Sequence, residues 1–273
     1  MVTRLRSETL EVVVDLTQGG ALTSLVDRRH GTQWLVTTDH PGPRVCGDFA
    51  TSGFAGWDDM LPTIVGEGLP DHGDVWCVSW EGIEQSEHRL EAAAVSPSTG
   101  LRLERTLELH PTEPLMTMTY SVVSESDTPV PFLWAGHPLF RADENTRIDV
   151  TPNNTWLRTD PSPATPSDLP DKPLAVIPAG GSGKWWSEMA TDVTGARLTH
   201  ADGRFIDLGW EKGSAVRHLG VWADNGHYSP TPTIALEPAI GWFDDLNMAI
   251  DNGTARYVRR GESVSWQMVV RCG

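Results

Sequence analysis

The stretch LMTMTYSVV (115–123) decides the fold class of this chain, because its side chains alternate between two kinds. Met116, Met118, Tyr120 and Val122 fall on one face, and Thr117, Thr119 and Ser121 fall on the other. A period of two is typical of a β-strand with one buried face. The stretch LRLERTLEL (101–109) repeats the pattern, with Leu101, Leu103, Leu107 and Leu109 on one face. We therefore expect two half-buried strands here.

Similar strand candidates follow one another along most of the chain. They are 10–15, 21–27, 75–80, 89–95, 131–140, 197–208, 218–223, 233–237 and 263–271. Within 197–208, Asp202-Gly203 separates two short apolar runs, which predicts a hairpin. Many short strands with turn signals between them are typical of a β-sandwich or barrel, so the sequence predicts an all-β protein.

Helical signals are scarce. Only 242–250 predicts one or two helical turns, which the Asp-Asn-Gly that follows should end. The longest irregular region, 159–184, is rich in Pro, Gly and Ser. Strand patterning resumes unchanged after it, so we expect a surface excursion across one sheet rather than a linker between domains.

The composition narrows the range of partners and compartments. The formal net charge of −16 argues against nucleic acid, whose phosphates need a basic surface. No apolar run reaches the length of about 18 residues expected of a transmembrane helix, and the first residues lack the apolar segment of a secretory signal. Cys46, Cys77 and Cys272 form no CxxC motif and cannot all pair with one another, so a reducing cytoplasm is the expected location.

Three polar residues interrupt apolar, strand-like stretches. His72 lies in LPDHGDVW, where Gly73 permits close approach of another group to the backbone, and His137 lies in FLWAGHPLF. Glu237 follows the apolar run TIAL and precedes a proline. Each has a structural explanation: buried histidines are mostly satisfied core side chains, and a strand-end glutamate can close a loop.

Together, a buried histidine and a buried glutamate predict acid–base chemistry. An imidazolium donates a proton near neutral pH, and an ionised carboxylate accepts one. A cupin-like metal site is the weaker interpretation, because no HxH or HxxxH pair is present. A nucleophilic serine has no GxSxG motif, and GGSGK (180–184) lacks the spacing of a phosphate-binding loop.

Tryptophan is abundant, with 12 residues. Several flank the polar candidates, namely Trp57, Trp76, Trp134, Trp222 and Trp242. Flat indole rings stack on the apolar faces of sugars, but they also fill large cores. We expect most of them in the core and one or two at a ligand.

Taken in order, these blocks resemble the aldose 1-epimerase (galactose mutarotase-like) family. The blocks are LTQGGALTSLVDRRHG, LPDHGDVW, FLWAGHPLF, HLGVWAD, IALEPAIGWFDDL and GESVSW, and they span nearly the whole chain. The resemblance implies one domain over residues 1–273, an antiparallel β-supersandwich that binds a sugar in a cleft on its concave face. It also implies an isomerase of carbohydrate metabolism, a mutarotase that needs no metal or organic cofactor.

The resemblance further implies roles for single residues. His137 would be the general acid that protonates the ring oxygen, and Glu237 the general base that deprotonates the C1 hydroxyl from the end of its strand. The ring then opens, C1–C2 rotates, and reclosure gives the other anomer. His72 would hold the ring oxygen or a nearby hydroxyl, and Trp134 and Trp222 are the tryptophans expected at the sugar.

Two departures from the family pattern matter. Many relatives carry an arginine upstream of the first histidine that grips sugar hydroxyls, whereas GFAGWDDMLPTI offers Asp58 and Asp59. Asp59 is our candidate hydroxyl ligand, although both acids can also be loop residues. Relatives acting on hexose 6-phosphates tend to carry an arginine shortly after the His-Gly pair. HGDVW lacks it, which favours a neutral sugar, while Arg44 and Arg141 stay possible phosphate ligands.

The expected function is therefore an aldose 1-epimerase acting on a free hexose or related sugar. One alternative is a non-catalytic carbohydrate-binding or regulatory module, which the missing arginine favours. Another is a hexose-6-phosphate 1-epimerase. The expected partner is a small-molecule sugar bound by a monomer or homodimer, with no nucleic acid and no membrane.

Overall fold

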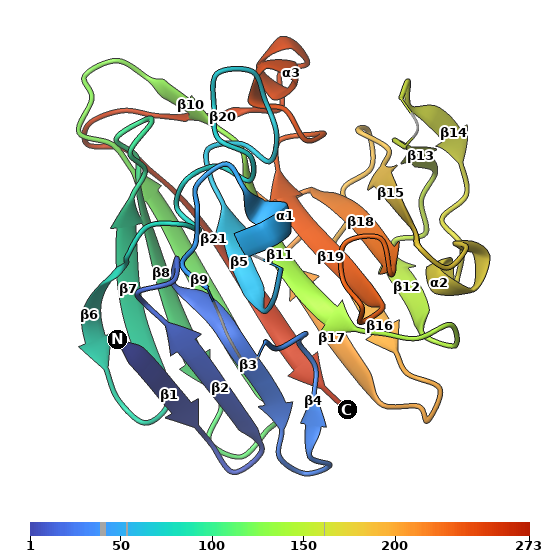
Figure 1. Ribbon diagram of the computed structural model, residues 1–273. Coiled ribbons are helices and arrows are strands. Elements are labelled where there is room, and N and C mark those ends of the chain that lie inside the picture. Colours follow the sequence, from blue (N-terminus) through green and yellow to red (C-terminus); the bar gives the residue numbers. More distant parts are fainter. Residues whose placement is uncertain (39–41, 53, 161) are drawn as a thin grey trace.

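Two large antiparallel sheets make up most of the computed structural model, which describes residues 1–38, 42–52, 54–160 and 162–273 (Figure 1). The first has eleven strands, in the order β1 (Val2–Arg6), β2 (Leu10–Asp15), β3 (Ala21–Asp27), β5 (Trp57–Met60), β11 (Trp134–Arg141), β19 (Thr233–Ile240), β18 (His218–Asn225), β15 (Gly181–Ser187), β13 (Trp156–Arg158) and β14 (Thr165–Ser167), with β4 (Thr32–Gln33) beside β3. The second has eight, in the order β12 (Arg147–Thr151), β16 (Gly195–Thr199), β17 (Phe205–Trp210), β21 (Ser263–Cys272), β9 (Leu115–Val123), β8 (Arg102–Leu109), β7 (Arg89–Val95) and β6 (Glu81–Gln85). A small pair joins β10 (Val130–Phe132) to β20 (Arg256–Val258).

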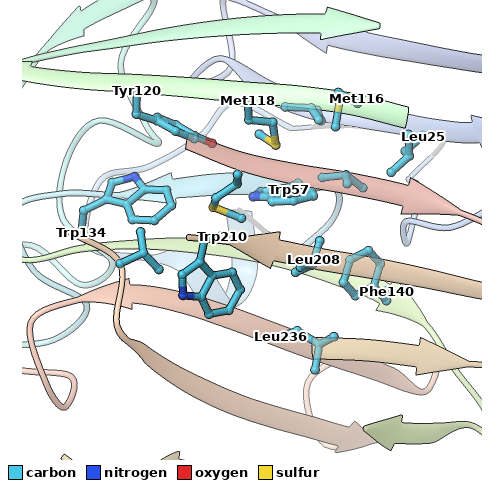
Figure 2. Close-up of a cluster of buried hydrophobic side chains, with 14 of the residues drawn as sticks. Leu25, Trp57, Met116, Met118, Tyr120, Trp134, Phe140, Leu208, Trp210 and Leu236 are labelled. Atoms are coloured by element: carbon cyan, nitrogen blue, oxygen red, sulfur yellow. The ribbon is translucent and has the colours of Figure 1, made fainter. Parts of the chain in front are cut away.

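The core lies between the two sheets, as strand alternation predicts. In β9, the side chains of Met116, Met118, Tyr120 and Val122 are all buried. Tyr120 reaches the first sheet, where its ring centroid is 4.9 Å from that of Trp134 (Figure 2). The predictions of an all-β protein and of the hairpin between β16 and β17 are confirmed.

Two strand predictions are wrong in detail. Residues 75–80 form turns held by side chains, because Trp76 Nε1 donates to the Gly73 carbonyl and Trp80 Nε1 donates to the Val75 carbonyl. The stretch 131–140 is divided between β10 and β11.

Helices are short, and α3 (Leu246–Asp251) is the longest among the described residues. It begins later than predicted because the Asp245 carboxylate caps it, accepting hydrogen bonds from the amides of Asn247 and Met248. None of the described helices is long enough to cross a membrane. The expected excursion at 159–184 contains β14 and α2 (Pro173–Val176), and its last residues begin β15.

The central strands β11 and β19 each carry a proline directly after a candidate residue, at Pro138 and Pro238. Proline has no N–H to donate to the ladder. Paired residues of the two strands therefore lie on either side of the prolines, with Ala135 opposite Ala239 and Leu139 opposite Ala235. The register is the same on both sides, which places His137 opposite Glu237. Glu237 thus lies inside β19 and does not end its strand, contrary to the sequence prediction.

A buried ion pair links the two sheets. Arg105 lies on the apolar face of β8, and its Nη1 is 2.7 Å from Oδ2 of Asp59 in β5. The other carboxylate oxygen accepts a hydrogen bond of 3.1 Å from Trp134 Nε1. Burial raises the pKa of Asp59, and the Arg105 guanidinium opposes that shift. This pair is therefore a structural contact between sheets.

Removal of one charge of this pair should destabilise the protein. We expect Asp59→Asn to lower the free energy of unfolding by about 3–5 kcal/mol, because it leaves Arg105 buried without its counter-charge. Urea denaturation of the variant measures this. The matched control is Glu262→Gln, which removes an exposed ion pair with Arg259 and should cost less than about 1 kcal/mol. Equal losses in the two variants would contradict the structural role of Asp59.

Candidate active site

The candidate site lies on the face of the first sheet that points away from the second. Directly paired residues of neighbouring strands project to the same face. Asp58 pairs with His137, Glu237 pairs with Gly220, and Gly220 pairs with Trp186. Since His137 lies opposite Glu237, these five residues form one row across β5, β11, β19, β18 and β15.

A pocket of about 300 Å³ lies over the middle of this row. Its polar lining consists of Asp71, His72, His137, Lys184, Glu237 and Asp244. Its aromatic lining consists of Phe49, Phe54, Trp222 and Tyr228. Phe49 belongs to the short helix α1 (Phe49–Ser52), which lies over the sheet near β5 and β11 (Figure 1). The pocket therefore combines ring faces with charged groups.

His72 reaches the pocket from a tight turn. Its φ is 63°, a left-handed conformation that is costly for a residue with a side chain. A Cβ at Gly73 would lie 2.1 Å from the Leu61 carbonyl oxygen, so a glycine is required there, as the sequence indicated. The His72 ring stacks on Phe49 with centroids 3.9 Å apart, and it lies 5.1 Å from the His137 ring. The turn thus brings the two histidines together.

His137 and Glu237 also come together. His137 Nε2 is 3.8 Å from Glu237 Oε1, and the two side chains are 6% and 0% exposed. Neither His137 Nδ1 nor Glu237 Oε1 has a hydrogen-bond partner among the described residues. The structure therefore brings the two predicted residues together, and within the described part of the chain each keeps one polar atom without a hydrogen bond.

Burial shifts the pKa values of His137 and Glu237 in opposite directions. Burial, assisted by His72 and Lys184, lowers the pKa of His137 well below the usual 6.5 of an imidazole. Burial raises the pKa of Glu237 above the usual 4.5, and the Lys184 cation opposes that rise. Such opposed shifts are typical of acid–base sites, because they arise where ionisable groups are desolvated together.

Lys184 is the charged residue that the sequence analysis missed. Its Nζ lies 2.9 Å from Glu237 Oε2 and 2.6 Å from Asp244 Oδ1. Asp244 is held in turn by Trp186 Nε1, which donates to its Oδ2 at 3.2 Å. The glycines of GGSGK (180–184) indicate a loop rather than a strand that carries a pocket residue. Lys184 and Trp186 share the pocket face, but both tryptophans of KWWS are buried, so no alternation in the sequence marks Lys184 as a pocket residue.

Trp222 is the predicted sugar-stacking residue that does line the pocket. It is half-buried, and its ring lies 5.5 Å from Phe54 and 6.5 Å from His137. The predictions for Asp59 and Trp134 are corrected. Both side chains point between the sheets, where they bond to each other, because their positions in β5 and β11 have the opposite parity to Asp58 and His137.

The two arginines considered as phosphate ligands are not among the pocket residues. Arg44 pairs with Asp58 and donates to the Trp76 carbonyl at 3.0 Å, and its side chain is only 8% exposed. Burial raises the pKa of Asp58 to about 6, against the opposing charge of Arg44. Arg141 lines a separate surface hollow with His200. Among the described residues, no group of His, Cys, Asp and Glu side chains is arranged to hold a metal ion.

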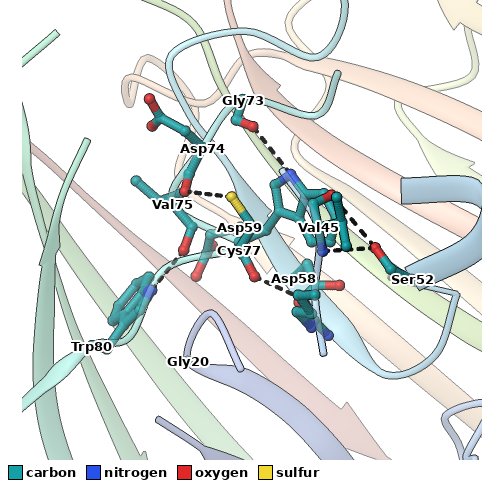
Figure 3. A network of polar contacts seen from close by, with 12 residues as sticks. Gly20, Val45, Ser52, Asp58, Asp59, Gly73, Asp74, Val75, Cys77 and Trp80 are labelled. Carbon is teal, nitrogen blue, oxygen red and sulfur yellow. Dashed lines mark hydrogen bonds and ion pairs between the residues drawn. The ribbon is translucent and has the colours of Figure 1, made fainter. Parts of the chain in front are cut away.

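A disulfide links the segment before α1 to the turns after His72. Cys46 and Cys77 are bonded, with their Cα atoms 5.3 Å apart, and Cys272 is free and buried. Figure 3 shows the polar contacts of this region, in which the Cys77 sulfur lies 3.1 Å from the Asp74 carbonyl oxygen. The disulfide bond joins two segments that supply pocket residues, Phe49 after Cys46 and His72 before Cys77. It also removes the basis for inferring a reducing compartment from the cysteines.

Comparisons with known proteins identify the fold. No protein-family profile matches the chain, and no curated protein sequence matches it. Among solved structures, the Slr1438 protein from Synechocystis sp. PCC 6803 matches with a TM-score of 0.80 at 15% identity, covering 100% of this chain and 96% of that one. A galactose mutarotase related enzyme from Lactobacillus acidophilus matches with a TM-score of 0.73 at 14% identity, covering 100% and 97%. A galactose mutarotase-like protein from Lactobacillus casei ATCC 334 matches with a TM-score of 0.75 at 15% identity, covering 100% of both chains. The chain thus has the galactose mutarotase-like fold, as the resemblance implied.

Thiol counting tests the disulfide. Protein purified without reductant and unfolded in guanidinium should react with one equivalent of maleimide, at Cys272, and with three equivalents after reduction. Intact mass spectrometry measures both numbers. The Cys46→Ala variant should show two reactive thiols without reductant, because Cys77 has then lost its partner. Three reactive thiols in the unreduced wild-type protein would contradict the disulfide.

Proposed function

We propose that this protein is an aldose 1-epimerase that interconverts the α and β anomers of a free hexose or a related sugar. The observation that carries the proposal is the buried pair of His137 and Glu237, with 3.8 Å between Nε2 and Oε1. Both residues line one pocket, and each has a polar atom with no hydrogen-bond partner in the part of the chain that the structure describes. A fold shared with galactose mutarotase-like proteins supports the proposal.

The proposed reaction is a pair of proton transfers. Glu237 Oε1 takes the proton of the C1 hydroxyl, and the electron pair left on that oxygen forms the C1 carbonyl. The bond between C1 and the ring oxygen breaks, and the imidazolium of His137 gives its proton to the ring oxygen. After rotation about C1–C2, the reverse transfers close the ring on the other face and restore both groups.

The remaining lining suits a sugar ring. Aromatic side chains present apolar faces to the C–H groups of a pyranose, and Trp222 and Phe54 contribute such faces here. His72 lies beside His137 and can hold the ring oxygen or a neighbouring hydroxyl. Contacts with these side chains would hold the sugar with its C1 hydroxyl and ring oxygen in position for the two proton transfers.

Charge in the pocket favours a neutral sugar over a hexose 6-phosphate. Lys184 is the one Lys or Arg among the described lining residues, and two carboxylates already contact its ammonium. Asp71 adds a further acidic group to the lining. A phosphate entering the pocket would meet negative charge, and the described lining offers it no lysine or arginine that lacks a carboxylate partner.

A binding module without turnover is the second candidate, because the pocket would hold a sugar even if no reaction followed. The acid–base pair argues for the enzyme, since binding alone does not require a buried histidine facing a buried carboxylate.

Mutarotation is the direct test. We expect the protein to accelerate equilibration of freshly dissolved α-glucose or α-galactose, followed by polarimetry. Glu237→Gln and His137→Asn should each reduce kcat by about 100- to 10,000-fold, because each removes one positioned proton transfer. Sugar binding, followed by tryptophan fluorescence, should persist in both variants. Glu262→Gln, on the exposed surface, is the matched control. Sugar binding without acceleration in the wild-type protein would establish the binding module instead.

The pH dependence follows from the two shifted groups. The lowered pKa of His137 means that its imidazolium population shrinks as pH rises toward neutrality. We therefore expect kcat/KM to fall about tenfold per pH unit on the alkaline side, with the optimum below pH 7. On the acid side, Glu237 takes up a proton at a higher pH than an ordinary glutamate and the rate declines. Polarimetric rates corrected for buffer catalysis measure the profile. A flat profile between about pH 6 and 8 would contradict the role of His137 as the acid.

A further inference from the structure

We infer that Lys184 is a positioning residue that prepares Glu237 for proton abstraction. Its ammonium occupies one oxygen of the Glu237 carboxylate and leaves the other, facing His137, as the proton acceptor. The role of Lys184 in catalysis rests on the proposed function. The effect of its positive charge on the ionisation of Glu237 does not.

The contacts divide the carboxylate into two unequal oxygens. Oε2 accepts a hydrogen bond of 2.9 Å from Lys184 Nζ, and Oε1 has no partner among the described residues. Gly220 is the register partner of Glu237, and a Cβ there would lie 3.1 Å from Oε2. The glycine therefore leaves the space in which Oε2 meets the ammonium. One oxygen is fixed, and the torsion of the carboxylate that aims the other is fixed with it.

The ammonium also offsets the electrostatic cost of burying the base. Glu237 is fully buried, and burial disfavours its ionised form. An opposite charge at hydrogen-bond distance restores that form, which a general base needs. Burial alone would lower the pKa of Lys184, but the carboxylates of Asp244 and Glu237 raise it above the usual value of a lysine. The cation is therefore present throughout the neutral range.

Asp244 explains how the ammonium stays satisfied during the reaction. When Glu237 accepts the proton of the C1 hydroxyl, it loses its negative charge. Lys184 then keeps Asp244 as its counter-ion, with 2.6 Å between Nζ and Oδ1. A lysine paired with Glu237 alone would become a buried and uncompensated cation at that step, which is strongly unfavourable. The triad of one cation and two carboxylates avoids this state.

The other charged groups facing Glu237 come from three elements. They are His137 on β11, His72 and Asp71 on the turn before Gly73, and Asp58 of β5, which is paired with Arg44. None of these groups is removed by the substitutions at Lys184 or Asp244. A difference in the pKa of Glu237 between these variants and the wild-type protein therefore reports on the contacts among Lys184, Glu237 and Asp244.

Two substitutions that should shift the pKa of Glu237 in opposite directions test the inference. Lys184→Met removes the cation at similar length and should raise the pKa of Glu237 by about one to three units, moving the acid side of the kcat/KM profile to higher pH. Asp244→Asn removes a negative charge that raises the pKa of Glu237, so it should move that side to lower pH. Lys184→Arg keeps the charge and should restore most of the wild-type profile. Lys212→Met, at an exposed lysine, is the matched control.

A readout without turnover separates this inference from the proposed function. The carboxyl carbon of Glu237 is titrated by NMR in protein labelled with 13C at glutamate, with Glu237→Gln identifying the signal. A raised pKa in Lys184→Met and a lowered one in Asp244→Asn support the inference even if no sugar is turned over, in which case only the proposed function fails. A pKa of Glu237 that is unchanged in both folded variants overturns the inference. If Lys184→Met does not fold, Asp244→Asn decides by itself.

Discussion

The pairing of β11 with β19 is the constraint on which the site depends. Their register places His137 opposite Glu237 on the pocket face, while the alternate positions of the same strands fill the core between the sheets. A shift of one residue would turn His137 into the core and Pro138 toward the pocket. The buried strands that surround this pair therefore determine the chemistry as much as the two side chains do.

Burial and ionisation oppose each other at this site. A fully buried carboxylate is a poor base unless a cation stabilises its charge, and a buried cation needs counter-charge of its own. The contacts among Glu237, Lys184 and Asp244 satisfy both requirements within one small cluster. A second buried pair, Asp59 with Arg105, follows the same rule between the sheets but has no access to the pocket. The same residue types thus serve structure on one face of the sheet and the candidate reaction on the other.

Sequence patterns predicted the all-β fold and singled out His72, His137 and Glu237, which line one pocket, because each interrupts an apolar stretch in a visible way. They misassigned Asp59 and Trp134, since nothing local distinguishes Asp58 from Asp59 until the pairing of β5 with β11 fixes which one faces the pocket. Lys184 was missed because its strand begins in a glycine-rich stretch that resembles a loop. Its partners lie 53 and 60 residues away, so only tertiary structure could bring them together.

The order of strands in the two sheets has a consequence for folding during synthesis of the chain. Strand β19 inserts between β11 and β18, which both precede it in the chain, and β21 inserts in the same way between β9 and β17 of the second sheet. During synthesis, the middle of each sheet therefore stays open until β19 and β21 have emerged. Four strands carry unpaired edges over that interval, and such edges can pair with another chain. The strand that carries Glu237 into the site is thus also the strand whose late arrival leaves β11 and β18 with open edges.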